Sequence, residues 1–114
     1  MIRNAAGRFV APSIEAVTAA AAGIAANLPP NTDYRISIVN APGAEAYPIS
    51  SFTWLLVYQT MPNADKGKKL LTFLHWALHD GEASASRLDY APLPAVLVTR
   101  LDSTLATIKV GETR

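Results

Sequence analysis

Two histidines and an aspartate are the side chains whose types and spacing come nearest to a metal-binding motif. His75 and His79 lie four residues apart in a segment with helical periodicity, and Asp80 follows directly. Side chains four apart share a helix face, so two imidazoles and a carboxylate could hold a metal ion for hydrolysis. Zinc hydrolases with this spacing also need a glutamate after the first histidine, where this chain has Trp76. The sequence therefore favours the alternative, two partly exposed histidines near a helix C-terminus with no metal ion, where positive charge is stabilising.

The other polar residues form no catalytic motif. The stretch 66–69 (Lys-Gly-Lys-Lys) has one glycine and no Ser or Thr after its lysines, which indicates a solvated first helical turn rather than a phosphate loop. Ser50, Ser51 and Thr53 lack a surrounding Gly-x-Ser-x-Gly elbow. We therefore expect no enzymatic activity and no cofactor. The carboxylates are scattered singly, so none can be paired as acid and base: Asp33, Glu45, Asp65, Asp80, Glu82, Asp89 and Asp102.

Composition narrows the class of protein further. The chain has 114 residues, half of them apolar, with 10 Lys+Arg against 9 Asp+Glu and a formal charge of +1. This balance excludes wholesale disorder and gives no electrostatic reason to expect nucleic acid as a partner. Cysteine is absent, which excludes disulfides, zinc–thiolate sites and thiol nucleophiles. The length predicts one domain that buries roughly two thirds of its unfolded surface in a sizeable core.

The sequence contains no candidate for a membrane or export segment. The alanine-rich run 16–26 includes Thr18 and Gly23, and it is too short and too weakly apolar to cross a bilayer. Met1 is not followed by a basic region, an apolar stretch and a small-residue cleavage site. We therefore expect no membrane insertion and no signal peptide in this sequence.

Apolar spacing and capping residues predict the helices that must position these side chains. A first helix is expected from the cap Ser13 to about residue 28, before Pro29. A second follows the cap Asn63 and ends at Gly81 in a left-handed conformation, with a shorter helical stretch at 82–88. A last helix is expected from Pro94 to Gly111. The stripes that predict the three long helices are Ile14, Val17, Ala21, Ile24 and Leu28; Leu70, Phe73, Leu74, Ala77 and Leu78; and Leu97, Leu101, Leu105 and Ile108.

Two segments have the pattern of strands. Residues 34–38 alternate apolar and polar side chains, which predicts a half-buried strand. Residues 51–58 are apolar on both faces, which predicts a central strand covered on both sides, with its aromatic residues and those of the second helix in the core (Trp54, Tyr58, Phe73 and Trp76). A central strand needs neighbours on both edges, and the chain hardly supplies them. We therefore expect an α/β fold, with helices packed on a small mixed sheet that a second copy of the chain completes in a homo-oligomer.

Three blocks of sequence, taken together, resemble a known family. They are residues 4–13 (Asn-Ala-Ala-Gly-Arg-Phe-Val-Ala-Pro-Ser), residues 46–57 (beginning Ala-Tyr-Pro-Ile-Ser), and residues 67–94, which end in Leu-Asp-Tyr-Ala-Pro-Leu-Pro. Their order and spacing resemble the C-terminal part of the periplasmic phosphate-binding protein of the phosphate ABC transporter. The resemblance extends over nearly the whole chain.

The resemblance carries expectations about fold and function. A family member is a two-lobed periplasmic binding protein of type II, roughly three times as long as this chain. Residues 1–45 resemble the end of its second lobe, residues 47–49 the return crossing, and residues 46–114 as a whole the returning part of its first lobe. The family binds inorganic phosphate, delivers it to a membrane permease, and is periplasmic or extracellular. Its anion ligands come from segments N-terminal to those present here, so no residue of this chain takes over a ligand role.

Two functional hypotheses follow from the sequence. The first is that the chain is a fragment of a phosphate-binding transport component that lacks the anion-ligand segments. The alternative is a self-associating structural or interaction domain with no small-molecule ligand. A metal-dependent hydrolase using His75, His79 and Asp80 remains a distant third.

Overall fold

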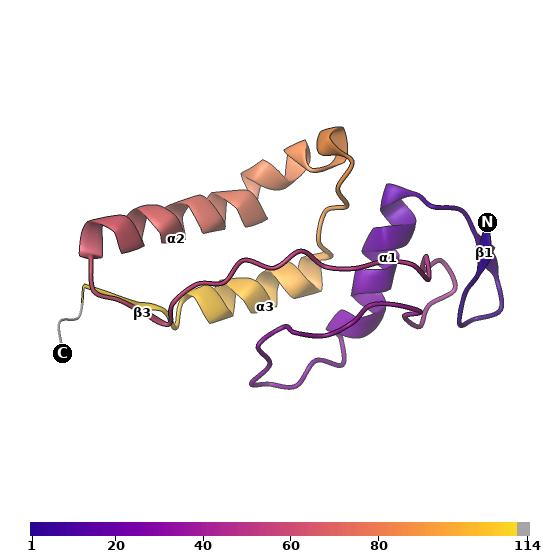
Figure 1. The fold of residues 1–114 in the computed structure, drawn as a ribbon, viewed down its shortest axis with the longest axis horizontal. Helices are drawn as coiled ribbons and strands as arrows, with labels where there is room; N and C mark the ends of the chain where they lie inside the picture. The colour runs from indigo at the N-terminus through magenta and orange to yellow at the C-terminus, as the bar shows by residue number, and fades with distance from the viewer. Residues whose placement is uncertain (112–114) are drawn as a thin grey trace.

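The computed structural model describes residues 1–111, which form an elongated body of 53 × 30 × 18 Å (Figure 1). A short hairpin and one helix occupy one end, and two helices fill the rest. None of the helices in the described part is both long and apolar enough to cross a bilayer. In chain order the elements are β1 (Ile2–Arg3), β2 (Phe9–Val10), α1 (Ile14–Ala25), β3 (Thr60–Met61), α2 (Ala64–Leu78), the 3-10 turns η1 (Asp80–Ser84) and η2 (Ser86–Leu88), α3 (Ala95–Leu105) and β4 (Lys109–Val110).

The helices begin where the sequence predicts. Ser13 Oγ accepts a hydrogen bond from the Ala16 N–H at 3.1 Å, and Asn63 Oδ1 accepts one from the Lys66 N–H at 3.0 Å. Both caps satisfy a backbone donor that has no partner within the helix. Pro94 is the N-cap of α3, where its missing N–H costs nothing.

The helix ends differ from the prediction. α1 ends at Ala25, three residues earlier than expected, and α3 ends at Leu105, well before Gly111. Gly81 lies inside η1 rather than in a left-handed cap. A Cβ at Gly81 would lie 2.8 Å from the Trp76 ring, so close approach to the indole, and not backbone conformation, is what suits glycine there.

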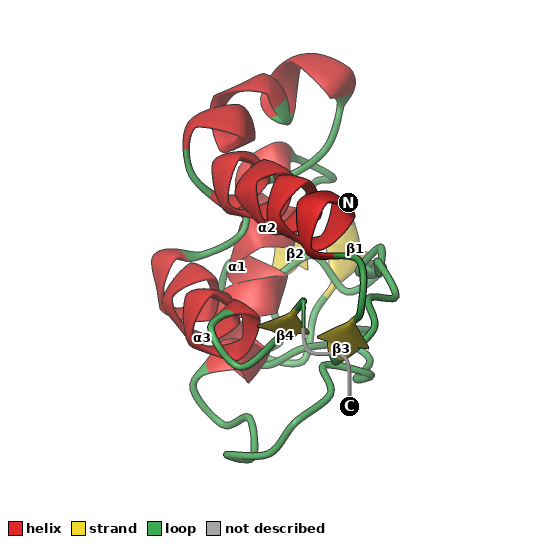
Figure 2. Ribbon diagram, turned by 90° about the vertical axis from the view of Figure 1, so that its left-hand side faces the viewer, coloured by secondary structure: helices red, strands yellow, loops and turns green. Residues whose placement is uncertain are grey.

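The α/β class is confirmed, with the strands in two separate ladders. β1 and β2 pair antiparallel, while β3 and β4 pair parallel. Along the long axis of the molecule, α2 and α3 lie side by side, with β3 and β4 near their ends (Figure 2). The strand predicted at 34–38 is wrong, although its alternation persists: Tyr34 and Ile36 are half-buried and Ile38 is buried.

The segment 51–58 is likewise not a strand of a sheet. It runs extended alongside α3 (Figure 1), and from Thr53 to Tyr58 its backbone makes no hydrogen bond to another described residue. Leu56 is 96% exposed and Leu55 71%. The prediction that the aromatic residues are core is wrong too, since all four are exposed: Trp54, Tyr58, Phe73 and Trp76. An extended segment needs a neighbouring strand to hide its backbone, and residues 1–111 supply none here.

The buried core is smaller than the length predicts. Six of the nine buried apolar residues among those described are alanines, and the others are Ile38, Leu74 and Leu97. A compact monomer of 12.2 kDa exposes roughly 6,100 Å², whereas this chain exposes 7772 Å². Its radius of gyration is 16.0 Å, against about 13 Å for a compact domain of this length. The chain thus has more surface and less interior than a self-contained domain.

Asn4 joins the N-terminal hairpin to a distant loop. Its side chain is buried, with Oδ1 accepting from the N–H groups of Ala6 and Arg8 at 3.1 and 3.0 Å. Its Nδ2 donates to three carbonyl oxygens of the loop 43–46, at 2.9 to 3.2 Å. The Asn4 side-chain amide therefore provides hydrogen-bond partners both for the turn between β1 and β2 and for the loop packed against α1.

Candidate functional site

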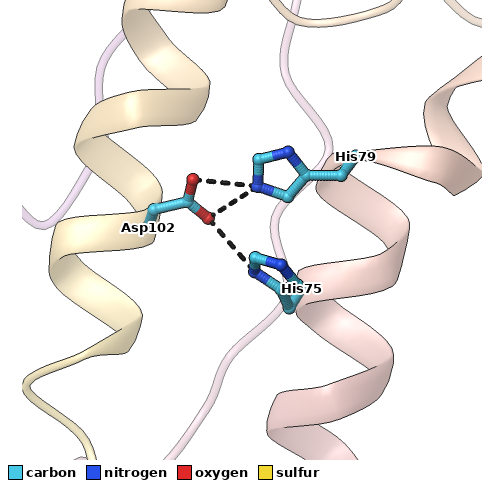
Figure 3. Close-up of side chains that lie close together, drawn as sticks. All are labelled: His75, His79 and Asp102. Atoms are coloured by element: carbon cyan, nitrogen blue, oxygen red, sulfur yellow. Dashed lines mark hydrogen bonds and ion pairs between the residues drawn. The ribbon is translucent and has the colours of Figure 1, made fainter.

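Three side chains, two from the C-terminal end of α2 and one from α3, meet at the exposed edge of the contact between these helices (Figure 3). Asp102 of α3 points toward His79, the C-cap of α2, whose Nε2 lies 3.0 and 2.9 Å from the two carboxylate oxygens. His75 Nδ1 lies 3.6 Å from Oδ1 of the same carboxylate. The two imidazole rings are 4.4 Å apart between centroids. One ligand atom from each residue fits within a span of 4.8 Å.

Packing of the two helices brings these residues together. Leu74, next to His75 on α2, is buried, and so is Leu97, five residues before Asp102 on α3. With these leucines turned inward, the polar side chains lie at the edge of the helix pair. The side chains of His75 and His79 are 68% and 40% exposed and that of Asp102 is 33% exposed. The group is therefore open to solvent ions.

The structure brings together a different set of side chains from the metal-binding group that the sequence suggests. His75 and His79 do share a face, as the four-residue spacing predicts, but Asp80 begins η1 and is not part of the cluster. Its place is taken by Asp102, which the sequence shows only as one of several single carboxylates. Asp102 lies 23 residues beyond His79, so only the contact between α2 and α3 reveals it.

The other sequence candidates have structural roles. The Lys-Gly-Lys-Lys stretch is the solvated start of α2: Lys69 pairs with Asp65 at 2.9 Å, and Gly67 packs against Val110. Ser50 is buried and donates to the Tyr47 carbonyl at 2.8 Å, which holds a turn. Neither arrangement presents a nucleophile or a phosphate cradle.

Asp33 is held ionised by its own loop. Its carboxylate accepts the backbone N–H of Arg35 at 3.1 Å and the guanidinium Nε at 2.7 Å. These two interactions, the backbone hydrogen bond first, lower the pKa of Asp33 below its ordinary value. Both side chains are largely exposed, so the pair orders the loop and has no general-acid role.

An apolar cleft of about 270 Å³ is the other notable feature of this half of the molecule. It is lined by the segment 52–57, by four residues of the loop after α1 and by the surfaces of α2 and α3; the loop residues are Leu28, Asp33, Tyr34 and Ile36. Leucines dominate the lining, which includes Leu74, Leu78, Leu93, Leu97, Leu101 and Leu105. Such a lining suits packing against other apolar side chains, not binding of an anion.

Comparison with known proteins identifies relatives for most of the chain. The phosphate-binding protein PstS of Xylella fastidiosa is 34% identical over 102 residues, which are 90% of this chain and 28% of that protein. PstS of Haemophilus influenzae is 32% identical over 102 residues, 90% of this chain and 30% of the relative. PstS of Methanocaldococcus jannaschii is 35% identical over 89 residues, 71% of this chain and 23% of the relative.

The match covers far more of this chain than of its relatives. No protein-family model matches the sequence. The chain spans between 23 and 30% of the length of these three curated relatives, from two bacteria and Methanocaldococcus jannaschii. The family resemblance inferred from the three sequence blocks is confirmed. The chain is homologous, over nine tenths of its length, to one segment of the PstS phosphate-binding proteins.

Proposed function

We propose that this chain is a segment of a phosphate-binding transport component, in which it completes a lobe without itself contacting the phosphate. The observation that carries the proposal is its 34% identity over 102 residues to a protein named for phosphate binding. The complete receptor would lie in the periplasm or outside the cell and deliver phosphate to the permease of an ABC transporter. Its work is binding and transfer, not catalysis.

The uncovered surface supports a role as part of a larger body. The extended segment 53–58 offers free backbone donors and acceptors together with exposed leucines, as a strand does when its sheet partners belong to another part of the protein. Relatives more than three times as long have ample chain to supply those partners. We place this segment within the sheet of the first lobe of the receptor.

The division of the chain between two lobes is part of the same proposal. Residues 1–45 would form the end of the second lobe, and residues 46–114 the returning part of the first. Support for this division comes from the cluster around α1, with Ile38 as its largest member, which draws all but two of its residues, Ala46 and Phe52, from residues 1–45. Pro48, which holds the residue before it extended, marks the crossing.

Phosphate titration tests whether this chain completes a lobe without itself contacting the phosphate. We expect isothermal titration of inorganic phosphate into the purified 114-residue chain to give no saturable heat, because the segments assigned to the anion are outside it. A 1:1 isotherm with micromolar affinity would contradict the proposal, since it would require a phosphate site built from these residues alone.

Self-association is the second candidate function, and the exposure of Leu55, Leu56 and Tyr58 on an unpaired backbone favours it. A second copy is the most available cover for this surface when the chain is alone. We expect dimers in light scattering at high micromolar concentration and their loss in L56K, because a charge cannot be buried in the apolar contact. A83K, on exposed Ala83 of η1, is the control. A wild-type monomer throughout the dilution series would exclude this function.

A further inference from the structure

We infer that His75, His79 and Asp102 form a binding site for a divalent transition-metal ion, with zinc the best match, which clips α2 to α3. The proposal does not depend on phosphate binding. It rests on a set of side chains that two different helices bring to one point, as Figure 3 shows.

The distances between the ligand atoms fit one ion. With metal–ligand bonds of about 2.0–2.1 Å, neighbouring ligand atoms around a tetrahedral zinc ion lie about 3.4 Å apart. One carboxylate oxygen of Asp102, Oδ1, lies 3.0 Å from His79 Nε2 and 3.6 Å from His75 Nδ1, on either side of that value, and the three ligand atoms all lie within 4.8 Å of one another. Rotation of the exposed histidine side chains would bring the three ligand atoms to this spacing and seat the ion between them.

The donor set selects the class of metal. Two imidazole nitrogens and one carboxylate oxygen suit zinc and its neighbours among the transition metals, whereas magnesium and calcium prefer sets made of oxygen. Three protein ligands leave a fourth position for water, and the exposure of the site gives an ion direct access from solvent. Both helices that the ion would join line the apolar cleft, so the ion would hold that side of the cleft together.

A simpler arrangement uses the same residues without an ion. His79 can donate its Nε2–H to Asp102, and this hydrogen bond alone ties the two helices. The variant D102N separates the two roles. An asparagine side-chain oxygen still accepts from His79, but as a neutral amide it is a far weaker metal ligand than a carboxylate.

The test is zinc binding by the full chain and four variants, with circular dichroism to compare their folds. We expect wild type to bind one Zn²⁺ in calorimetry. Its Tm should rise by about 10 °C at a zinc concentration about 100-fold above Kd. H75N, H79N and D102N should each lose at least about tenfold in affinity. D80N is the matched control, a neighbouring carboxylate outside the cluster, and should bind as wild type does.

A second readout does not require a cooperative melting transition. Co²⁺ in place of Zn²⁺ should give the visible absorption of a four-coordinate ion with wild type and D80N, and only that of the hydrated ion with D102N. Absence of saturable zinc uptake by wild type would overturn the proposal. So would equal zinc affinity in wild type and D102N, because the site would then not include the α3 carboxylate.

Discussion

Replacing Asn4 by aspartate should strongly destabilise the packing of the N-terminal hairpin against the loop 43–46. The Asn4 amide nitrogen donates to the carbonyls of Gly43, Ala44 and Ala46, and an aspartate would turn a carboxylate oxygen toward them instead. A buried charge would then face three unsatisfied acceptors. We expect N4D to lose about 4 kcal/mol of unfolding free energy.

The loss of unfolding free energy in N4D should also depend on pH. It should shrink as the pH is lowered far enough to protonate the new carboxyl, because the acid form regains one O–H donor. N31D is the control, since Asn31 is exposed and its replacement adds the same charge to the chain. Urea titrations measure both variants. If N4D were no less stable than N31D, the amide network would not hold the hairpin to the loop.

A methyl group at Gly23 should also destabilise the fold, against the intrinsic preference of helices. Gly23 lies on the face of α1 that meets the loop 40–46, and an added Cβ would collide with the Pro42 carbonyl oxygen. The collision is with backbone, so no side-chain rotation relieves it. Overpacking of this kind costs up to about 3 kcal/mol, from which about 1 kcal/mol of helix propensity is regained. We expect a net loss of about 2 kcal/mol in G23A, measured by thermal or urea unfolding.

The neighbouring residue provides the control for G23A. Ala22 is exposed on the same helix, so A22G tests helix propensity alone and should cost about 1 kcal/mol. G23A and A22G should therefore destabilise by different mechanisms, one steric and one conformational. A G23A protein more stable than wild type would show that the loop does not rest on α1.

Features that depend only on neighbouring residues can be predicted from this sequence, whereas features that depend on contacts between distant residues cannot. Ser13 and Asn63 begin their helices because a side-chain oxygen beside free N–H groups needs nothing from the rest of the fold. Residues 51–58 have strand composition, but a ladder needs a second strand, and residues 1–111 place none beside them. The role of Asn4 and the meeting of Asp102 with the histidines depend on contacts between distant parts of the chain, which spacing does not encode.

Complementation tests most directly whether this chain is a lobe-completing segment of a phosphate receptor. The X. fastidiosa relative would be prepared without the segment that matches this chain, and phosphate would be titrated into that protein alone, with its own missing segment, and with the 114-residue chain. If the relative's own segment restores phosphate binding, the divided receptor assembles from its two parts. We predict that this chain also restores saturable 1:1 phosphate binding and that L56K, altered in the uncovered segment, does not. Restoration by the relative's own segment but not by this chain would contradict the account.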